Sequence, residues 1–503
     1  MVYVKLEGHS YKYEIENIIK QFYREEQICY TDTTPPVTNR GIFLYSKIIS
    51  RPQSSLIITS LNGEKSFLAE KTREFMHEGT GSTELKRCQK REVSRQVYDL
   101  LTEYSGRKLP WGVLMGIRPA KLVHEMLQKE MNRQDILSEL TGYYRLSEPK
   151  AKLLYEVAQS EKKILDNTPI NSVSLYIGIP FCPTRCLYCS FTAYPISKYQ
   201  GVVKAYLEAL KKEIHAVNNE IIKRKGIKID SIYIGGGTPT SLNAIELKYL
   251  LDSIEDILEL SDVREYTIEA GRPDSINEEK LSTIKSSRVD RISINPQSMN
   301  ESTLKLIGRQ HSPQDILKTY ELARKLGFKN INMDIIAGLP GENLQAFEKT
   351  LEQIKVMKPD SLTVHTLAIK KASLLYRQMD KYSELHEDEI EKMVDVAGHS
   401  AADMGMNPYY LYRQKNILGN LENIGYCTPG KESIYNVQIM EEKQTIIAFG
   451  ADAVTKVVFP EEDRIERAFN VKGVEEYIAR IDEMITRKKL LLQDMKHLSI
   501  DNG

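Results

Sequence analysis

Three of the six cysteines in this 503-residue chain lie within one short segment, as Cys182, Cys186 and Cys189. Their C-x3-C-x2-C spacing lets three thiolates from a single loop converge on one metal centre. A structural zinc site takes four ligands, and this segment supplies no fourth. A [4Fe–4S] cluster is normally held by four thiolates, so three cysteines would leave one iron open to a small molecule. The spacing therefore favours a catalytic iron–sulfur site; three core cysteines, or a zinc loop with a fourth ligand from elsewhere, remain alternatives.

Composition and charge place the chain among ordinary globular proteins. Hydrophobic residues make up 41% and charged residues 27% of the chain, and its length exceeds the roughly 150 residues of one domain. Lys+Arg and Asp+Glu both number 69, so the formal net charge is 0, which argues against a general nucleic-acid-binding surface. No segment reaches ~18 uncharged apolar residues, and the first residues carry charges throughout. We therefore expect no membrane segment, no signal peptide and a cytoplasmic location.

Six short strand-like segments, rich in β-branched residues, alternate with helical segments along the middle of the chain. This alternation predicts an α/β fold in which a parallel sheet closes partly or fully into a barrel. The expected strands are 174–181, 231–237, 265–270, 291–297, 330–338 and 361–369.

Polar or unusual residues lie at the end of each expected strand, where the active site of an α/β barrel is found. The cysteine segment follows the first strand and the glycine-rich segment 235–240 ends the second. Glu269 and Gln297 end the next two, and the last two carry Asp334 and His365. Together these residues predict a single polar pocket at one rim of the barrel. The glycines would let a ligand approach the backbone closely.

Two regions flank the expected barrel core. The expected organisation is an N-terminal α+β domain of unknown role at 1–165, the core at 172–380, and a C-terminal sheet extension with a helical end at 381–503. In the first region, Asn62-Gly63 between two alternating runs predicts a β-hairpin. The polar segment 159–173 looks like a linker. Strand-like segments at 408–414 and 445–454 are expected to extend the barrel sheet at its edge.

The cysteine spacing at the end of the first strand resembles the signature of radical S-adenosylmethionine (SAM) enzymes. Over about residues 172–455 the chain resembles the oxygen-independent coproporphyrinogen III oxidase (HemN) family, in the segments YIGIPFCPTRCLYCSF, IGGGTPT, YTIEAGRPD, RISINPQS and NMDIIAGLPGE. The N-terminal segment LPWGVLMGIRPAKLVHE is similar to the HemZ branch of this family. The resemblance implies a radical SAM partial (β/α)6 barrel that carries a [4Fe–4S] cluster and binds SAM.

The resemblance also assigns roles to residues. Cys182, Cys186 and Cys189 would ligate the cluster. The positions that match SAM contacts of the family are Tyr176, Tyr188, Gly236, Gly237, Thr238, Glu269, Gln297, Arg309 and Asp334. Within this set, Tyr188 would pack on the adenine and the 236–238 segment would bind the amino group. Glu269 would hold the ribose or the amino group, and Tyr176 would lie on the substrate and SAM side of the pocket.

The reaction implied by the family is the oxidative decarboxylation of coproporphyrinogen III propionates to vinyl groups, which gives protoporphyrinogen IX in haem biosynthesis. It implies two partners, a tetrapyrrole substrate and an electron donor of the ferredoxin or flavodoxin type. The substrate has four carboxylates, so the pocket should offer cations. Residues that follow the barrel strands or lie near the sheet edge supply five candidates: Arg272, Lys370, Lys371, Arg413 and Lys415.

Two positions depart from the pattern of well-studied family members. Phe191 stands where they carry a further cysteine two residues after the third, and Gly178 stands where they carry a histidine. Two other functions therefore remain open. One is a haem-binding protein or haem chaperone that keeps the cluster. The other is a radical SAM enzyme that acts on haem or another tetrapyrrole.

Overall fold

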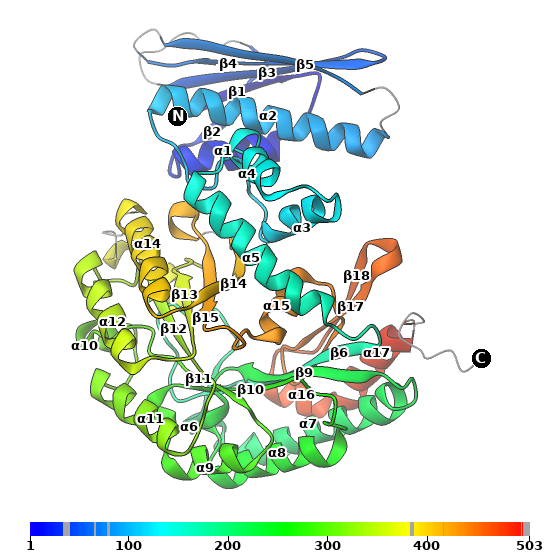
Figure 1. Ribbon diagram of the computed structural model, residues 1–503, viewed down its shortest axis with the longest axis vertical. Coiled ribbons are helices and arrows are strands. Elements are labelled where there is room, and N and C mark those ends of the chain that lie inside the picture. The colour runs from blue at the N-terminus through cyan, green and yellow to red at the C-terminus, as the bar shows by residue number, and fades with distance from the viewer. Residues whose placement is uncertain are drawn as a thin grey trace. The chain divides into compact units, whose positions relative to one another are not determined.

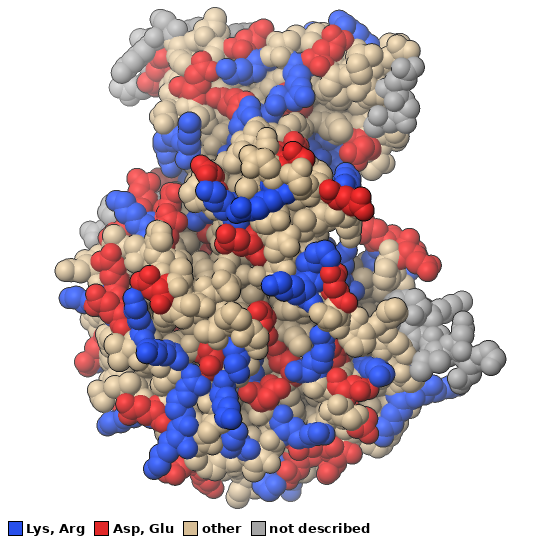
Figure 2. Space-filling view, in the orientation of Figure 1, with Lys and Arg blue, Asp and Glu red and all other residues tan. Residues whose placement is uncertain are grey.

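The computed structural model describes residues 1–33, 41–64, 67–77, 81–382, 387–415, 417–493 and 495. The chain forms two compact units, residues 1–155 and residues 156–503 (Figure 1). In the described part of the chain, no helix combines the length and the apolar character needed to cross a membrane. Over the face shown in Figure 2, lysines and arginines of the second unit are interspersed with aspartates and glutamates.

The first unit is an α+β domain built on one mixed sheet. Within the described residues the strand order is β2-β1-β3-β4-β5, with β1 parallel to both of its neighbours and the other pairs antiparallel. The strands are β1 (Val2–Glu7), β2 (Ile28–Tyr30), β3 (Ile42–Ser50), β4 (Ser54–Asn62) and β5 (Leu68–Met76). Antiparallel pairing of β4 with β5 confirms the predicted hairpin; residues 65–66 of its expected second run lie outside the described residues.

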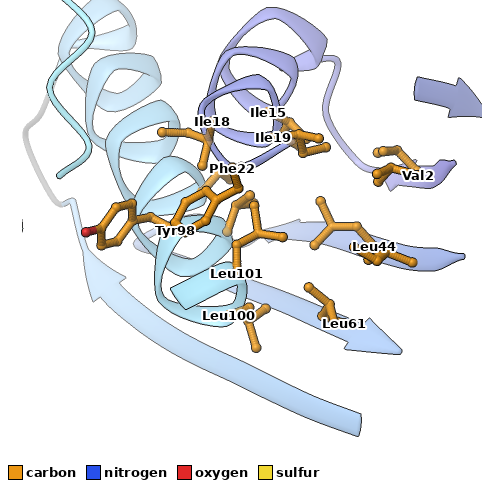
Figure 3. Close-up of a cluster of buried hydrophobic side chains, with 14 of the residues drawn as sticks. Val2, Ile15, Ile18, Ile19, Phe22, Leu44, Leu61, Tyr98, Leu100 and Leu101 are labelled. Carbon is orange, nitrogen blue, oxygen red and sulfur yellow. The ribbon is translucent and has the colours of Figure 1, made fainter. Parts of the chain in front are cut away.

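Two helices supply the core of this unit. In α1 (Lys12–Phe22) the buried residues Ile15, Ile18, Ile19 and Phe22 recur at three- and four-residue steps, which places them on one face. They pack with side chains of β1, β3, β4 and α2 (Ser82–Ser105) in one hydrophobic cluster (Figure 3). The other described helices that lie wholly within the unit are α3 (Ala120–Gln128) and α4 (Arg133–Gly142).

The second unit is built on a long sheet whose central part is parallel, which confirms the predicted α/β core. Within the described residues six parallel strands lie in chain order, as β6-β9-β10-β11-β12-β13. They are β6 (Ser172–Ile179), β9 (Lys228–Gly236), β10 (Glu265–Gly271), β11 (Arg291–Ile294), β12 (Ile331–Ala337) and β13 (Ser361–Thr366). Their residues are buried almost without interruption, as expected for strands covered on both faces.

The helices of the core follow these strands along the chain. They are α7 (Val203–Val217), α8 (Ala244–Ile257), α9 (Glu278–Ser286), α10 (Glu301–Leu306), α11 (Pro313–Lys325) and α12 (Leu344–Met357). Side-chain caps define the starts of all of these helices except α7; Asn243 at α8 and Ser312 at α11, for example, each form a capping box. The strand–helix alternation makes the carboxyl ends of the strands meet at one edge.

C-terminal strands extend both ends of the barrel sheet. Beside β6 lie β16 (Ile446–Phe449), which is parallel to it, and then β17 (Val454–Phe459) and β18 (Arg464–Phe469), which are antiparallel. At the opposite end, β15 (Asn423–Cys427) is antiparallel to β13 and carries β14 (Asn407–Tyr412) on its outer side.

The predicted linker at 159–173 is wrong for most of its length. Residues up to Asp166 complete α5 (Glu148–Asp166), and Ser172 begins β6. The polar composition came from the exposed face of the helix, where Lys162 and Lys163 lie. On another face, Ile164 and Leu165 pack against the buried cluster around Tyr409.

Candidate functional site

All twelve residues predicted for cluster and SAM binding lie in the wall of one cavity of about 590 Å³ in the second unit. Most follow strands at their carboxyl ends, as the barrel rule predicts. Tyr176 and Asp334 lie within β6 and β12, and Arg309 follows α10. The structure thus brings together side chains that are more than 150 residues apart in the chain (Tyr176 and Asp334, 334 − 176 = 158). The individual binding roles of these residues stay predictions.

The cysteine loop follows β6 and is tied to the neighbouring polypeptide by its backbone. Leu187 N donates to Ile307 O at 3.0 Å, and Cys189 N donates to Cys186 O at 3.2 Å. Cys186 is buried, with 8% of its surface exposed. The sulfur of Cys182 lies 3.5 Å from the hydroxyl of Thr238, at the end of β9. All three thiols therefore face one cavity from a loop that is held in place.

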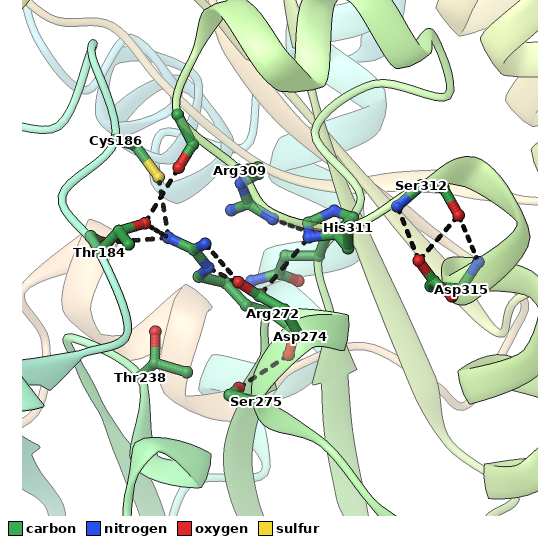
Figure 4. Close-up of polar contacts among 12 residues, drawn as sticks. Thr184, Cys186, Thr238, Arg272, Asp274, Ser275, Arg309, His311, Ser312 and Asp315 are labelled. Carbon is green, nitrogen blue, oxygen red and sulfur yellow. Dashed lines mark hydrogen bonds and ion pairs between the residues drawn. The ribbon is translucent and has the colours of Figure 1, made fainter. Parts of the chain in front are cut away.

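The electrostatic setting of these thiols disfavours free thiolates and makes them depend on a cation or a bound metal. Burial raises the pKa of Cys182 to about 11 and also raises the pKa of Cys189, so cations or a metal are needed to favour the thiolates. Arg272 supplies one cation, with its Nη1 3.6 Å from the sulfur of Cys186 (Figure 4). In the part of the chain that the structure describes, the sulfurs of Cys182, Cys186 and Cys189 do not all lie within 4.8 Å of one another. Three ligands of a single zinc ion would have to lie that close together.

The glycine-rich segment after β9 lies against the strand that leads into the cysteines. Gly237 N donates to Ile179 O at 2.8 Å, and Thr238 N donates to Phe181 O at 2.7 Å. A Cβ at Gly237 would lie 2.5 Å from Phe181 O, and Gly236 has φ of +109°. Only glycine permits this close approach, which brings the 236–238 backbone to the cavity wall.

Glu269 and its neighbours form a buried polar group beside the glycines. The hydroxyl of Tyr233 donates to Glu269 Oε1 at 2.6 Å. Burial, strengthened by the charge of Asp334, raises the pKa of Glu269 to about 7. Tyr233 was not predicted from the sequence, although its position two residues before Gly235 in a strand places its side chain on the face to which the Cα hydrogen of Gly235 points.

Without SAM, the Glu269→Gln protein should become more stable relative to the wild-type protein as pH rises from about 5 to about 8. The pKa of Glu269 lies above its ordinary 4.5. The stability that Glu269 contributes to the wild-type protein is therefore fully present below pH 4.5 and is lost as pH rises through about 7. Glutamine keeps an acceptor for Tyr233 and does not titrate. Thermal unfolding of both proteins across this range measures the difference, with Glu279→Gln on the exposed face of α9 as the charge control; a difference that stays constant with pH would contradict the prediction.

A second group of predicted residues meets on the other side of the cysteine loop. The hydroxyl of Tyr188 donates to Gln297 Oε1 at 3.2 Å and lies 3.4 Å from Arg309 Nη2. Gln297, at φ of +67°, donates its backbone N–H to Asp334 O at 2.9 Å. His365 Nε2 lies 3.8 Å from Asp334 Oδ2. Burial is the largest single influence and raises the pKa of Asp334, but the hydrogen bond and charge of His365, with hydrogen bonds from Asn332 and Thr363, together outweigh it and lower that pKa.

Of the five cations predicted to bind substrate carboxylates, some line the cavity and some do not. Arg272 and Lys370 line the cavity, whereas Lys371, Arg413 and Lys415 are not among its lining residues. Lys371 and Lys415 are exposed, and Arg413 is buried and donates to Asn420 O at 2.8 Å. The prediction is therefore wrong for these three. Sequence position after a strand does not tell which of two adjacent lysines points inward.

Other lining residues carried no sequence signal. Tyr435 in α15 (Ile434–Glu441) stacks on Tyr233 and on Tyr176, with ring centroids 4.5 Å and 6.2 Å apart. Lys456, from β17, adds a cation to the wall. These contacts join segments that are distant in the chain, and no local pattern marks them.

The fold and the cysteine loop define a radical SAM protein, and comparisons with known proteins agree. The family model described as "Radical SAM superfamily" matches residues 176–354. The chain is 38% identical to the "Oxygen-independent coproporphyrinogen-III oxidase-like protein HemZ" of Bacillus subtilis, over 98% of each chain. The chain therefore belongs to the radical SAM superfamily, in the HemN-like family of oxygen-independent coproporphyrinogen-III oxidase-like proteins.

Two further matches have narrower coverage. The "Heme chaperone HemW" of Bacillus subtilis is 33% identical over 56% of this chain and 70% of its own. The solved structure of coproporphyrinogen III oxidase (HemN) from Escherichia coli matches with a TM-score of 0.51 and 22% identity, over 65% of this chain and 73% of that one. The structural match supports the fold alone.

Proposed function

We propose that this chain oxidatively decarboxylates the propionate side chains of coproporphyrinogen III to vinyl groups. The observation that carries the proposal is the cavity in which three cysteines on one loop face the residues that match SAM contacts. Similarity over nearly the whole length of a coproporphyrinogen-III oxidase-like protein supports the substrate class.

The residues that would hold the cofactors fit them. Cys182, Cys186 and Cys189 would bind a [4Fe–4S] cluster, and the 236–238 backbone with Glu269 would bind SAM beside it. When bound, these groups supply the one-electron chemistry that removes a hydrogen atom from a propionate. The carboxylate then leaves as carbon dioxide, and one electron passes to a one-electron acceptor. The chain's own part is to hold SAM and the propionate together and to exclude water.

Side chains of this chain can perform that positioning. Arg309 and Glu269 offer a cation and an acid to the charged groups of SAM, and Lys370 offers a cation to a substrate carboxylate. A low-potential donor of the ferredoxin or flavodoxin type would supply the electron that starts each cycle.

An anaerobic turnover assay tests the proposal. Protein with a reconstituted cluster is mixed with SAM, a strong reductant and coproporphyrinogen III, and products are read by mass spectrometry. Vinyl product together with 5′-deoxyadenosine supports the proposed reaction. 5′-Deoxyadenosine without decarboxylation would contradict it and direct the assay to haem as substrate.

A haem-binding role is the second candidate, because the chain is 33% identical to a haem chaperone over 56% of its length. It predicts tight haem binding with little substrate-dependent cleavage of SAM. Haem titration of the same protein, followed by absorption spectroscopy, separates it from the proposed enzyme.

Charge reversal at Lys370 should weaken substrate binding by about tenfold or more, since a buried charge-assisted hydrogen bond contributes about 1.5–3 kcal/mol. Lys370 lines the cavity near Cys189, and burial lowers its pKa. Lys371 is exposed and is the matched control one residue away. The KM for coproporphyrinogen III is measured for Lys370→Glu and Lys371→Glu. Equal KM values for the two variants would rule out this role of Lys370.

A further inference from the structure

Arg272 follows β10 directly and reaches across to the cysteine loop. It is buried, with 3% of its surface exposed. Its Nη1 donates to the Thr184 carbonyl at 3.0 Å and to the Thr184 hydroxyl at 2.9 Å, and it lies 3.6 Å from the sulfur of Cys186 (Figure 4). One nitrogen of this guanidinium therefore contacts both the backbone of the loop and one of its thiols.

Asp274 fixes the other side of the same guanidinium. It accepts from Arg272 Nε at 2.9 Å and from Arg272 Nη2 at 2.6 Å, a bidentate pair that fixes the plane of the group. His311 Nδ1 lies 3.4 Å from Asp274 Oδ1, and the imidazole is nearly fully buried. Arg272 is therefore oriented by its own carboxylate, and its remaining nitrogen is aimed at the cysteine loop.

These contacts leave Arg272 poorly suited to the role expected from its position in the sequence. A guanidinium that already forms a bidentate pair with a carboxylate has little capacity left for a substrate carboxylate. The second buried arginine of the region, Arg309, uses Nη1 to donate to Asn295 O at 2.5 Å and Nη2 toward the Tyr188 hydroxyl at 3.4 Å. Arg309 also interacts with the Cys186 sulfur, so Arg272 is distinguished by its bidentate pair with Asp274.

We propose that Arg272, oriented by Asp274, is a positioning residue that holds the Cys186 sulfur and makes the bound cluster easier to reduce. The inference rests on the proposed cluster site. Hydrogen bonds to ligand sulfurs and nearby positive charge stabilise the electron that a cluster gains on reduction, so they raise its reduction potential. Electron transfer to the cluster opens each catalytic cycle, and Arg272 thus adjusts that step without touching SAM or substrate.

The test compares the cluster reduction potential of wild-type protein with those of Arg272→Gln and Arg272→Lys. Glutamine removes the charge, whereas lysine keeps it but cannot contact Asp274 and Cys186 at the same time. Arg264→Lys is the matched control. Arg264 precedes β10 and also pairs with an aspartate, Asp230, through Nε at 2.5 Å and Nη2 at 2.9 Å, at the strand end opposite to the cysteines. Potentials are measured on reconstituted, SAM-free protein by redox titration followed with electron paramagnetic resonance.

We expect Arg272→Gln to make reduction about tenfold less favourable, which is a shift of about 59 mV to lower potential for one electron. Arg272→Lys should recover part of this shift, and Arg264→Lys should match the wild-type protein. If Arg272→Gln retains too little iron for a titration, Arg272→Lys decides the question, because a wild-type potential in that variant would overturn the inference. Equal shifts in Arg264→Lys and Arg272→Lys would overturn it as well.

Iron and sulfide content is determined first in every sample. Absence of a cluster from the wild-type protein would contradict the proposed function itself. A normal cluster with an unchanged potential in both Arg272 variants would contradict only this inference.

Discussion

Cys186→Ala is expected to abolish the iron–sulfur cluster and with it all formation of 5′-deoxyadenosine and vinyl product. The loop supplies three thiolates to a cluster that is normally held by four, so removal of one leaves two and the cluster cannot be retained. Cys186 is the most deeply placed of the three. It is 8% exposed, its carbonyl accepts from Cys189 N, and its sulfur contacts Arg272.

The measurement is iron and sulfide content, with visible absorption, after anaerobic reconstitution, followed by the turnover assay. Cys88→Ala is the control, since Cys88 lies on α2 in the first unit and its thiol contacts Glu84 at 3.9 Å. That variant should bind the full complement of iron. A Cys186→Ala protein with wild-type iron content would contradict the cluster assignment, and zinc in place of iron in the wild-type protein would favour the zinc alternative.

The barrel core could be predicted from the sequence because its signals are local. Each central strand is a short buried apolar run, and most polar residues of interest follow such a run or lie within it. The rule that strand ends meet at one edge then converts positions along the chain into proximity in space. It placed Glu269, Gln297 and the cysteines in the wall of one cavity, as the structure shows.

Contacts within the site could not be predicted in the same way, because they depend on side-chain direction and on distant segments. Arg272 was expected to bind substrate, and the structure instead pairs it with Asp274, two residues further along the chain. Tyr435 reaches the cavity from a helix that follows the barrel by many residues, and its stacking on Tyr233 has no local marker. Composition also misled at α5, where an exposed polar face resembled a linker.

Glu213→Ala is expected to lower the free energy of unfolding of the second unit by about 3–5 kcal/mol, the range for breaking a buried ion pair. Glu213 lies on α7 with a fully buried side chain that is paired with Lys488 of α17 (Ile481–Gln493), itself buried. The carboxylate also accepts from Tyr477 OH at 2.7 Å, from Gly450 N at 2.9 Å and from Asn470 Nδ2 at 2.9 Å. Alanine would leave these donors and a buried ammonium without their acceptor. Burial already lowers the pKa of Lys488.

The same pair of segments offers a matched control in Glu220→Ala. Glu220 follows α7 and pairs with Lys489, the residue next to Lys488, but its side chain is 50% exposed. An exposed ion pair contributes about 0–1 kcal/mol, so this variant should unfold close to the wild-type protein in urea. The difference between the variants isolates the effect of burial, because both remove one carboxylate that faces α17. Equal losses would show that the buried Glu213 pair contributes no more than the exposed Glu220 pair, and would contradict the prediction.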